Sequence, residues 1–346
     1  MAIFMIGTQR SGSNLLRLMV NQLPSVAAPH PPHILVRMMP LVEAGAYGGL
    51  RDAESLLNLT EDVCRLVELN PIPWKDVKLD RHAVIANCRA PTLLGIMEAV
   101  YDELARAWGA DDWCCKSMAN IHYLPEIETH FDEPRYIYLY RDGRDVALSF
   151  KNAIVGEKHV YHIAREWART QRLALALEPN VPGDRFFKVG YEQILEYPEK
   201  TMKKLCRFLG REYDSGMLDF FESGEAKSAA STSNLWGNVS RPIMKSNYGK
   251  FLTQSSPEES RIFESVAGDV LDKLGYRRYY IEPGEEIRFT SAHLAEFDEE
   301  NARMKKEVLM GVDSSDRERR DRQQGFIESI FSRVENSKFT EKYNRH

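Results

Sequence analysis

Residues 7–14 form a glycine-containing loop that includes an arginine, a pattern that suits phosphate binding. An apolar strand pattern precedes this loop and a helical pattern follows it. The backbone N–H groups and the positive end of the helix dipole therefore converge on one spot. Gly7 and Gly12 keep the G-x-x-x-x-G spacing of an ATP-binding loop, but Ser13 stands where such a loop has its lysine. With Arg10 as its cation, the loop is predicted to cradle a phosphate other than that of a nucleoside triphosphate.

A second strand-to-helix pattern lies at 135–150, where an apolar run ends at Arg141 and a helical pattern carries Ser149 eight positions later. The two segments together resemble the PAPS-dependent sulfotransferases. R-S-G-S-N-L-L at 10–16 is similar to their 5′-phosphosulfate loop, and R-D-G-R-D-V-A-L-S at 141–149 is similar to their 3′-phosphate motif. Either motif alone is weak evidence. Their order, and their separation by more than a hundred residues, make the pair specific.

Shorter matches to the same family follow along the chain, so the resemblance covers roughly 3–277. They are Lys116-Ser117 after a short apolar run, Trp167 in a helical stretch, the segment 188–192, Pro198 and the segment 206–210. The C-terminal tail has no comparable match.

The resemblance implies that PAPS is the sulfuryl donor and PAP the product. Arg10 would hold the 5′-phosphate and stabilise the leaving group. Further donors would come from the same loop, from Ser11, Gly12, Ser13, Asn14 and Leu15, with Asn14 in place of the common Thr. Arg141 would hold the 3′-phosphate through two hydrogen bonds and Ser149 through its hydroxyl. Tyr191 matches the family Tyr near the adenine; the alternative is a half-buried core aromatic.

Residues 240–251 stand where cytosolic sulfotransferases close the site with a Gly-rich element. They keep cations and a Gly-x-aromatic ending but lose the glycine-rich phosphate clasp. Arg241 and Lys245 are therefore expected to contact the 3′-phosphate, and Phe251 is expected to pack where the family has a Trp.

In-line sulfuryl transfer also needs a base for the acceptor proton and a cation near the moving group. Lys116 is the candidate cation, the alternative being a solvated lysine at a strand end. His33, with His30 in reserve, is the predicted base, because 28–34 occupies the place where several sulfotransferases carry a Glu or His base. The alternative is that these proline-flanked histidines lie on a surface loop. His-x-x-His lacks a third ligand cluster, so no metal is predicted.

Strand patterns alternate with helical stretches, which predicts an α/β fold with a P-loop-like parallel sheet flanked by helices. The strand patterns lie at 3–6, 113–116, 135–140 and 185–189. A helical insertion over 34–108 separates the first two, and in this fold such insertions wall the acceptor pocket. We expect a catalytic domain over 1–280 and a charged helical C-terminal extension over 281–346. That extension either docks on the domain or on a partner subunit, or is partly disordered.

The 346 residues are 43% hydrophobic and 28% charged, which suits one large α/β core. A net charge of −5 argues against a nucleic-acid partner. Five cysteines without a CxxC pair favour a reducing compartment. The first strand begins too early for a signal peptide, and no apolar run approaches the length of a membrane span. These features predict a cytoplasmic enzyme of bacterial type, without a membrane anchor, acting on a small-molecule acceptor; a homodimer is compatible with them.

Three functions remain open at this point. The favoured one is a sulfotransferase acting on a hydroxyl or amine of a small metabolite, lipid or carbohydrate. A P-loop-type kinase is disfavoured by the missing lysine of the loop and by the Arg141–Ser149 pair. A non-catalytic nucleotide-binding relative would keep both loops and lose the base.

Overall fold

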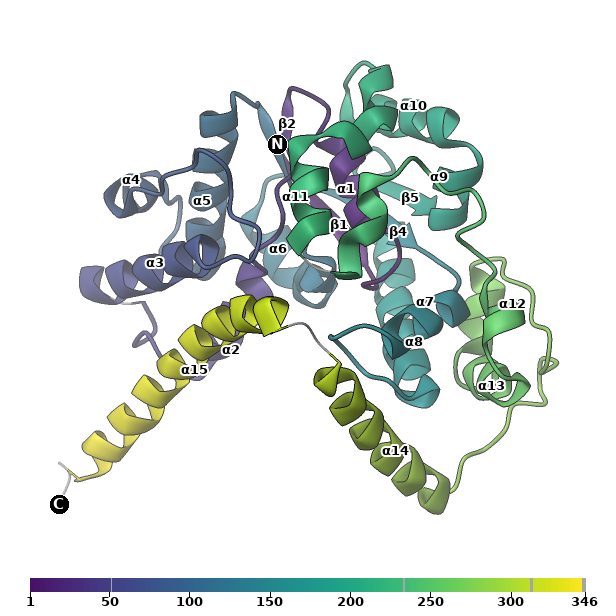
Figure 1. Ribbon diagram of the computed structural model, residues 1–346. Helices are drawn as coiled ribbons and strands as arrows, with labels where there is room; N and C mark the ends of the chain where they lie inside the picture. The colour runs from purple at the N-terminus through teal and green to yellow at the C-terminus, as the bar shows by residue number, and fades with distance from the viewer. Residues whose placement is uncertain (51, 233, 312–313, 344–346) are drawn as a thin grey trace. The chain divides into compact units, whose positions relative to one another are not determined.

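The structure is a computed structural model that describes residues 1–50, 52–232, 234–311 and 314–343 (Figure 1). The chain divides into two compact units. The first unit comprises Met1–Phe4, Arg17–Arg135 and Ser314–His346, and the second comprises Met5–Leu16 and Tyr136–Asp313. The two predicted phosphate motifs thus belong to the second unit, whereas the predicted base belongs to the first.

Five strands form a parallel sheet in the order β2-β3-β1-β4-β5. They are β1 (Ala2–Gly7), β2 (Val26–Ala27), β3 (Asp112–Cys115), β4 (Arg135–Tyr140) and β5 (Phe186–Gly190). The inner residues of β1 and β4 are buried whichever face of the sheet they point to, which explains why both strands read as continuous apolar runs. The four predicted strands and their parallel arrangement are confirmed. β2 is an addition, because two residues are too few to carry a pattern.

The first unit holds the helices of the predicted insertion. They are α2 (Ile34–Glu43), α3 (Ala53–Glu68), α4 (Arg81–Asn87) and α5 (Leu93–Trp108), followed by the 3-10 helix η1 (Met118–Tyr123) and α6 (Leu124–His130). Local capping explains their bounds. The Asp52 carboxylate accepts the N–H of Ser55 at 2.7 Å where α3 begins, and α5 ends at Gly109 in the left-handed conformation. The helical character predicted for 34–108 is confirmed.

Helix α1 (Ser13–Val20) begins in the second unit and ends in the first. Its other helices are α7 (Gly143–Lys151), α8 (Val160–Leu177), η2 (Glu178–Asn180), α9 (Tyr191–Glu196), α10 (Pro198–Leu209), η3 (Ser215–Glu222), α11 (Gly224–Thr232), η4 (Asn234–Ser240), α12 (Phe251–Gln254), α13 (Pro257–Lys273) and α14 (Ser291–Met310). Trp167 on α8 and Phe263 on α13 meet in a buried core with ring centroids 5.5 Å apart. The Trp167 indole also donates to the carbonyl of Arg141 at 3.3 Å, so this core fixes the end of β4.

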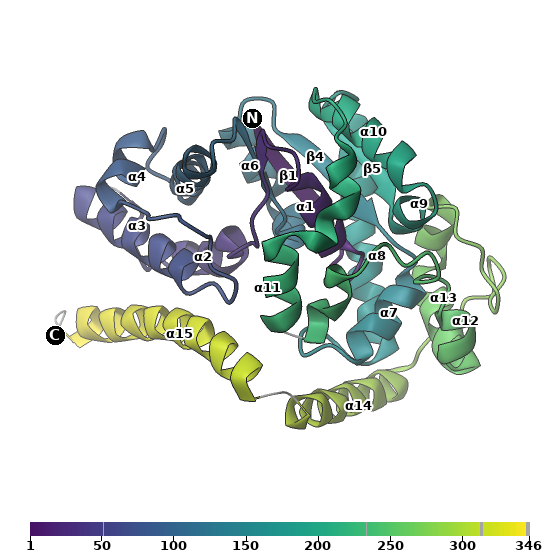
Figure 2. The same ribbon diagram turned by 45° about the horizontal axis from the view of Figure 1, so that its top comes forward.

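The extension forms two helices that pack on different units (Figures 1 and 2). In the second unit, the Asn301 side chain of α14 accepts the N–H groups of Lys158 and His159 at 2.8 and 3.0 Å. In the first unit, α15 (Ser314–Tyr343) donates from Gln323 to the carbonyl of Leu66 at 3.0 Å. The predicted charged helices are confirmed over the described part of the extension, and both dock on their own chain.

Candidate active site

The phosphate loop of the second unit has an unusual backbone. Arg10 has φ 68° and Gly12 has φ 87°, both in the left-handed region. A Cβ atom on Gly12 would lie 2.2 Å from a ring carbon of Tyr191, so only glycine lets the ring of Tyr191 approach the loop this closely. The Gly12 carbonyl then accepts the N–H of Leu16 at 3.1 Å and begins α1. The loop is thus shaped by a residue more than a hundred positions away.

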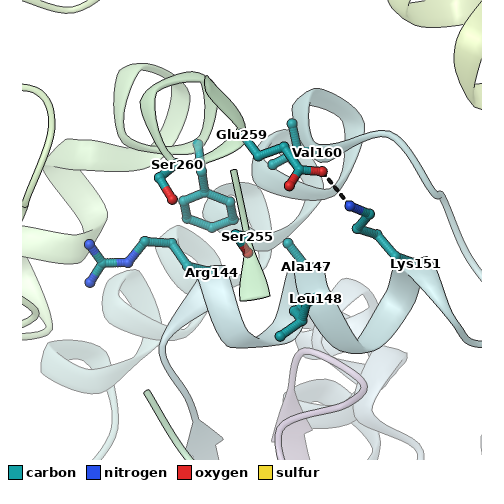
Figure 3. A pocket seen from close by; sticks show the side chains of 9 residues that line it. Arg144, Ala147, Leu148, Lys151, Val160, Ser255, Glu259 and Ser260 are labelled. Carbon is teal, nitrogen blue, oxygen red and sulfur yellow. Dashed lines mark hydrogen bonds and ion pairs between the residues drawn. The ribbon is translucent and has the colours of Figure 1, made fainter. Parts of the chain in front are cut away.

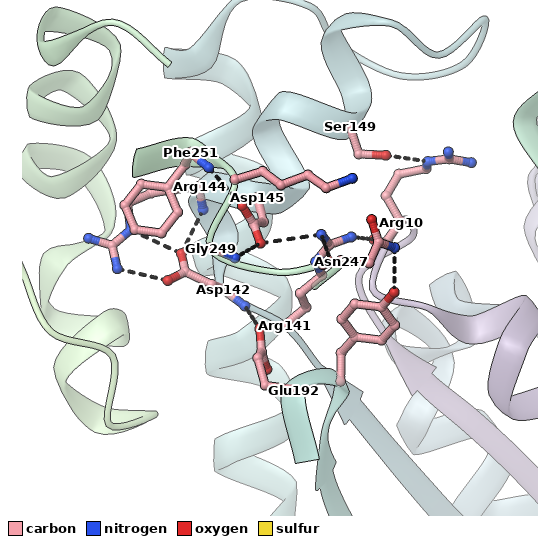
Figure 4. Close-up of polar contacts among 12 residues, drawn as sticks. Arg10, Arg141, Asp142, Arg144, Asp145, Ser149, Glu192, Asn247, Gly249 and Phe251 are labelled. Atoms are coloured by element: carbon pink, nitrogen blue, oxygen red, sulfur yellow. Dashed lines mark hydrogen bonds and ion pairs between the residues drawn. The ribbon is translucent and has the colours of Figure 1, made fainter. Parts of the chain in front are cut away.

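The two predicted phosphate motifs meet in this unit (Figure 4). The Nε of Arg10 donates to the hydroxyl of Ser149 at 3.0 Å, and the Arg141 guanidinium donates to the carbonyl of Arg10 at 3.2 Å. The Arg141 guanidinium also lies 4.6 Å from the ring centroid of Tyr191. We refer to Arg10, Ser11, Asn14, Arg141, Ser149 and Tyr191 as the donor cluster.

Buried polar atoms in the donor cluster suit an anionic ligand. Ser11 is fully buried, and its hydroxyl has no hydrogen-bond partner among the described residues. The same holds for the Nε of Arg141 and for the side-chain oxygen of Asn14, whose amide can be turned to donate. Buried polar groups are normally satisfied, so these atoms fit a ligand rich in acceptor oxygens. The residues predicted to bind PAPS therefore fit a phosphate chemically.

Arg141 is held in place by neighbours that the motif does not reveal. Its guanidinium donates to the Asp145 carboxylate at 3.3 Å and to the carbonyl of Asn247 at 3.1 Å. Asp145 also accepts the N–H groups of Gly249 and Phe251, at 2.7 and 3.0 Å, which ties the segment before α12 to α7. One buried carboxylate thus positions both Arg141 and residues 240–251, which we call the closing segment.

A second buried ion-pair network stands beside it. Arg144 pairs with Asp142 through two hydrogen bonds, at 3.0 and 2.8 Å, and with Glu264 at 2.6 Å. Its guanidinium lies 4.0 Å from the ring centroid of Phe251, which is buried as the sequence predicts for an aromatic at this position. Burial raises the pKa of Asp142, and Arg144 opposes that rise. This network braces α7 against α12 and α13.

The closing segment contributes an asparagine that sequence reasoning missed. The Asn247 amide donates to the Tyr191 hydroxyl at 2.7 Å, in addition to the carbonyl contact with Arg141. Arg241 and Lys245, the two cations predicted here, are exposed. Their contact with the 3′-phosphate stays a prediction. The signal for Asn247 was weak, because a lone Asn before Tyr-Gly reads as a turn residue.

In the first unit, His33 begins α2 with a left-handed backbone, φ 61° and ψ 43°. Its Nδ1 lies 2.8 Å from the Ser117 hydroxyl. Burial, and then the charges of Lys116 and Arg37, together lower the pKa of His33 to about 3. Lys116 is only 9% exposed, so the alternative of a solvated strand-end lysine is wrong. The unit therefore brings His33, Ser117 and Lys116 together around a neutral imidazole.

His30 has a structural environment instead. It is 5% exposed, its Nδ1 lies 3.2 Å from the Asn70 side-chain oxygen, and its carbonyl accepts from Asn70 and Trp74. Burial, and then the charge of Lys116, lowers its pKa. The alternative that His30 lies on a surface loop is wrong, because its side chain is buried.

Other features of the described residues add no second site. A small hollow between α7, α8 and α13 is lined by Arg144, Phe263 and the ion pair Lys151–Glu259, and lies outside the donor cluster (Figure 3). No group of three or more His, Cys, Asp or Glu side chains within the described part of the chain could hold a metal ion. None of the described helices is both long and apolar enough to cross a membrane.

Comparison with known proteins agrees with this geometry. The sequence model described as Sulfotransferase family matches residues 2–215. The chain belongs to the sulfotransferase family. The match includes the donor cluster and His33 and ends before the closing segment and the C-terminal extension.

Two nematode relatives carry the same enzyme name. Protein-tyrosine sulfotransferase A of Caenorhabditis elegans is 24% identical over 280 residues, which are 79% of this sulfotransferase and 67% of the relative. A putative protein-tyrosine sulfotransferase of Caenorhabditis briggsae is 26% identical over 147 residues. That match covers 37% of this chain and about half, 51%, of the relative.

Two solved sulfotransferase domains share the fold. The domain from the olefin synthase of Synechococcus PCC 7002 superposes with a TM-score of 0.52 at 22% identity, covering 76% of this chain and 93% of that one. The domain from the curacin biosynthetic pathway superposes with a TM-score of 0.55 at 21% identity. This match covers 80% of this chain and 98% of that one. The predicted family, fold class and reaction, sulfuryl transfer by an enzyme, are therefore confirmed.

Proposed function

We propose that this sulfotransferase moves a sulfuryl group from PAPS to a hydroxyl of a small-molecule acceptor, without a metal, and releases PAP. The observation that carries the proposal is the donor cluster of the second unit. There two arginines and a serine from separate motifs converge, and the buried Ser11 hydroxyl and Arg141 Nε have no hydrogen-bond partner in the part of the chain that the structure describes. Such atoms are costly to bury unless a ligand satisfies them.

Each residue of the cluster has a role that follows from its contacts. Bound PAPS would supply the sulfuryl group and a leaving group whose charge grows on the oxygen bridging to the 5′-phosphate. The loop N–H groups, Ser11 and Arg10 would hold that phosphate. Arg141 and Ser149 would hold the 3′-phosphate. Because Arg10 donates to Ser149, each motif orients the other.

His33 is the base of the proposal. With its Nδ1–H donating to Ser117, its Nε2 carries the lone pair that accepts the acceptor proton. An imidazole whose pKa is near 3 is a weak base. It takes the proton only as the acceptor oxygen bonds to sulfur, when the hydroxyl becomes strongly acidic. Ser117 acts as a positioning residue that selects the tautomer.

The acceptor and the compartment are part of the same proposal. The names of the nematode relatives make a protein tyrosine the competing acceptor. All five cysteines are free thiols, which supports a reducing, cytoplasmic compartment. A homodimer stays a prediction, since α14 and α15 both pack on their own chain; its test is the mass in solution.

The first test is a thermal-shift titration with adenosine 3′,5′-bisphosphate (PAP), AMP and ATP. A ligand that binds only the folded state raises the melting temperature. At a concentration a hundred times its Kd, it adds about 2.7 kcal/mol to the free energy of unfolding. We expect PAP to stabilise the protein far more than AMP or ATP. A preference for ATP would favour a kinase, and no response to any of the three would contradict the proposal. The rates of sulfuryl transfer from PAPS to phenols, sugars and tyrosine peptides then show which class of acceptor the enzyme prefers.

A further inference from the structure

Ser149 lies in the last turn of α7, and the chain that follows it packs back on that turn. Residues 152–159 lead from α7 to α8, and we call them the α7–α8 loop. Gly156 in this loop has φ 76°, and a Cβ atom on it would lie 2.6 Å from a ring carbon of Phe150. Since Phe150 directly follows Ser149, the loop packs on the turn that carries the Ser149 hydroxyl.

The α7–α8 loop is closed by its own buried lysine. Lys158 is 1% exposed, and its Nζ donates to the carbonyls of Val155 and Gly156 at 2.8 and 2.7 Å. A buried ammonium group needs such acceptors, because burying it without them is costly. These bonds link the end of the loop to its middle. A contact made at Lys158 is therefore passed on to Gly156 and to the ring of Phe150.

Helix α14 of the C-terminal extension holds the end of this loop (Figure 1). The side-chain oxygen of Asn301 accepts the N–H groups of Lys158 and His159 at 2.8 and 3.0 Å. Its amide nitrogen donates to the Glu157 carboxylate, which also pairs with Lys305 of α14 at 2.6 Å. The single side chain of Asn301 therefore contacts three consecutive residues of the loop.

The docking of α14 is polar rather than apolar. Over the 20 residues of α14 the buried side chain is Asn301. The half-buried Phe297 adds a ring stacked on His159, with centroids 4.4 Å apart. A surface helix usually buries a whole apolar stripe, and segments with few buried apolar contacts open at low cost in free energy. The contacts of α14 with the loop can therefore be broken without unfolding the core.

We propose that Asn301 is a positioning residue for the 3′-phosphate site. By holding the α7–α8 loop it fixes the last turn of α7, and with it the hydroxyl of Ser149. Undocking of α14 then lowers the affinity for PAPS and PAP. The inference rests on the proposed function, which assigns Ser149 to the 3′-phosphate. Asn301 lies outside the residues 2–215 that match the sulfotransferase family, so the C-terminal extension takes part in donor binding.

The first test compares the binding of PAP and AMP to the full chain by isothermal titration. Asn301→Ala removes the acceptor of two N–H groups of the loop. We expect it to raise the Kd of PAP about fivefold, the value of one neutral hydrogen bond, and to leave the Kd of AMP unchanged, since AMP has no 3′-phosphate. Lys306→Ala, at an exposed position of α14, is the control. Unchanged PAP binding in Asn301→Ala, or equal losses for PAP and AMP, overturns the inference.

An exchange of side-chain groups separates positioning from a general loss of stability. The double variant Glu157→Gln, Asn301→Asp places the acid and the amide the other way round. The new acid on α14 still accepts both N–H groups of the loop, accepts from the new amide, and pairs with Lys305 four residues later. We expect it to restore the Kd of PAP to within about twofold of wild type. A double variant that binds PAP no better than Asn301→Ala overturns the inference.

Hydrogen exchange tests the same coupling in the wild-type protein, whether or not the variants fold. Coupling between two sites is reciprocal, so PAP should in turn hold the loop on α14. We expect PAP, and not AMP, to slow exchange of the Lys158 and His159 amides about fivefold. If the wild type binds no PAP, the proposed function fails. If it binds PAP and these amides do not respond, the inference fails and the proposed function stands.

Discussion

Two regions of this enzyme treat positive charge in opposite ways. In the donor cluster, Arg141 already contacts a carboxylate and two carbonyls, and its Nε has no hydrogen-bond partner among the residues that the structure describes. In the first unit, the charges of Lys116 and Arg37 add to burial in lowering the pKa of the His33 imidazole. The first arrangement is preorganised for one fixed ligand. The second keeps an imidazole neutral, because burial and neighbouring cations both oppose its protonation.

The regions also share a feature. Each holds a non-glycine residue in the left-handed conformation, Arg10 in one and His33 in the other. Such a backbone costs on the order of 1–3 kcal/mol and persists only where surrounding contacts enforce it. In the donor cluster the enforcing contacts are those of Ser149 and Arg141, and around His33 one is Ser117. Arg10 and His33 are both assigned to the chemistry, whereas Leu50, Asp76 and Glu133 share this backbone region without such a role.

The largest effect is expected at His33. Replacing it with Gln should lower kcat by about 10²- to 10⁴-fold, the usual contribution of a general base, and leave the Kd of PAP unchanged. His82→Gln, at an exposed histidine of α4 in the same unit, is the control. If His33→Gln keeps its turnover, the base lies elsewhere and the contrast between the two regions loses its catalytic meaning.

The pH dependence sharpens the same prediction. Because the pKa of His33 is near 3, the wild-type kcat should stay level between pH 5 and 8 and fall only toward pH 3. An exposed imidazole in the unfolded chain has a pKa of 6.5, so between these values the unfolded state binds more protons. Folding stability from this group is complete above pH 6.5 and declines as pH falls toward 3. Urea unfolding at pH 7 and 4.5 should show a smaller decline in His33→Gln.

The next largest effect concerns Arg141. Arg141→Ala should weaken PAP binding about a hundredfold, since two charge-assisted hydrogen bonds to the 3′-phosphate are lost, and should leave AMP binding almost unchanged. Isothermal titration measures both. Arg169→Ala, at an exposed arginine of α8, is the matched control. Equal losses for PAP and AMP would mean that Arg141 supports the loop rather than recognising the 3′-phosphate.

The smallest effect compares neighbouring residues of the closing segment. Asn247→Ala removes the amide donor to Tyr191 and should weaken PAP binding about fivefold, the value of one neutral hydrogen bond. Lys245→Ala tests the cation predicted from the sequence. If Lys245→Ala weakens PAP binding more than Asn247→Ala does, then Lys245 contacts the 3′-phosphate as the sequence predicts.

Much of the fold and of the donor cluster was predictable, because the deciding signals are local. The apolar runs of β1 and β4 come from strands buried on both faces, and the loop with Gly12 follows directly on the first of them. Arg141 and Ser149 were predictable for the same reason, since Arg141 follows the end of β4 directly and α7 places Ser149 at a fixed offset from it. The two-residue β2 and Asn247 carry no such pattern.

The sequence by itself determined the order of elements, the two phosphate motifs and the family, since each depends on spacing within a short segment. Only the tertiary structure decided which charges meet. Asp145 accepts the N–H of Gly249, and Arg10 donates to Ser149, across separations of more than a hundred residues. Such encounters depend on how helices pack after the chain has folded, and packing depends on shape and burial rather than on spacing along the sequence.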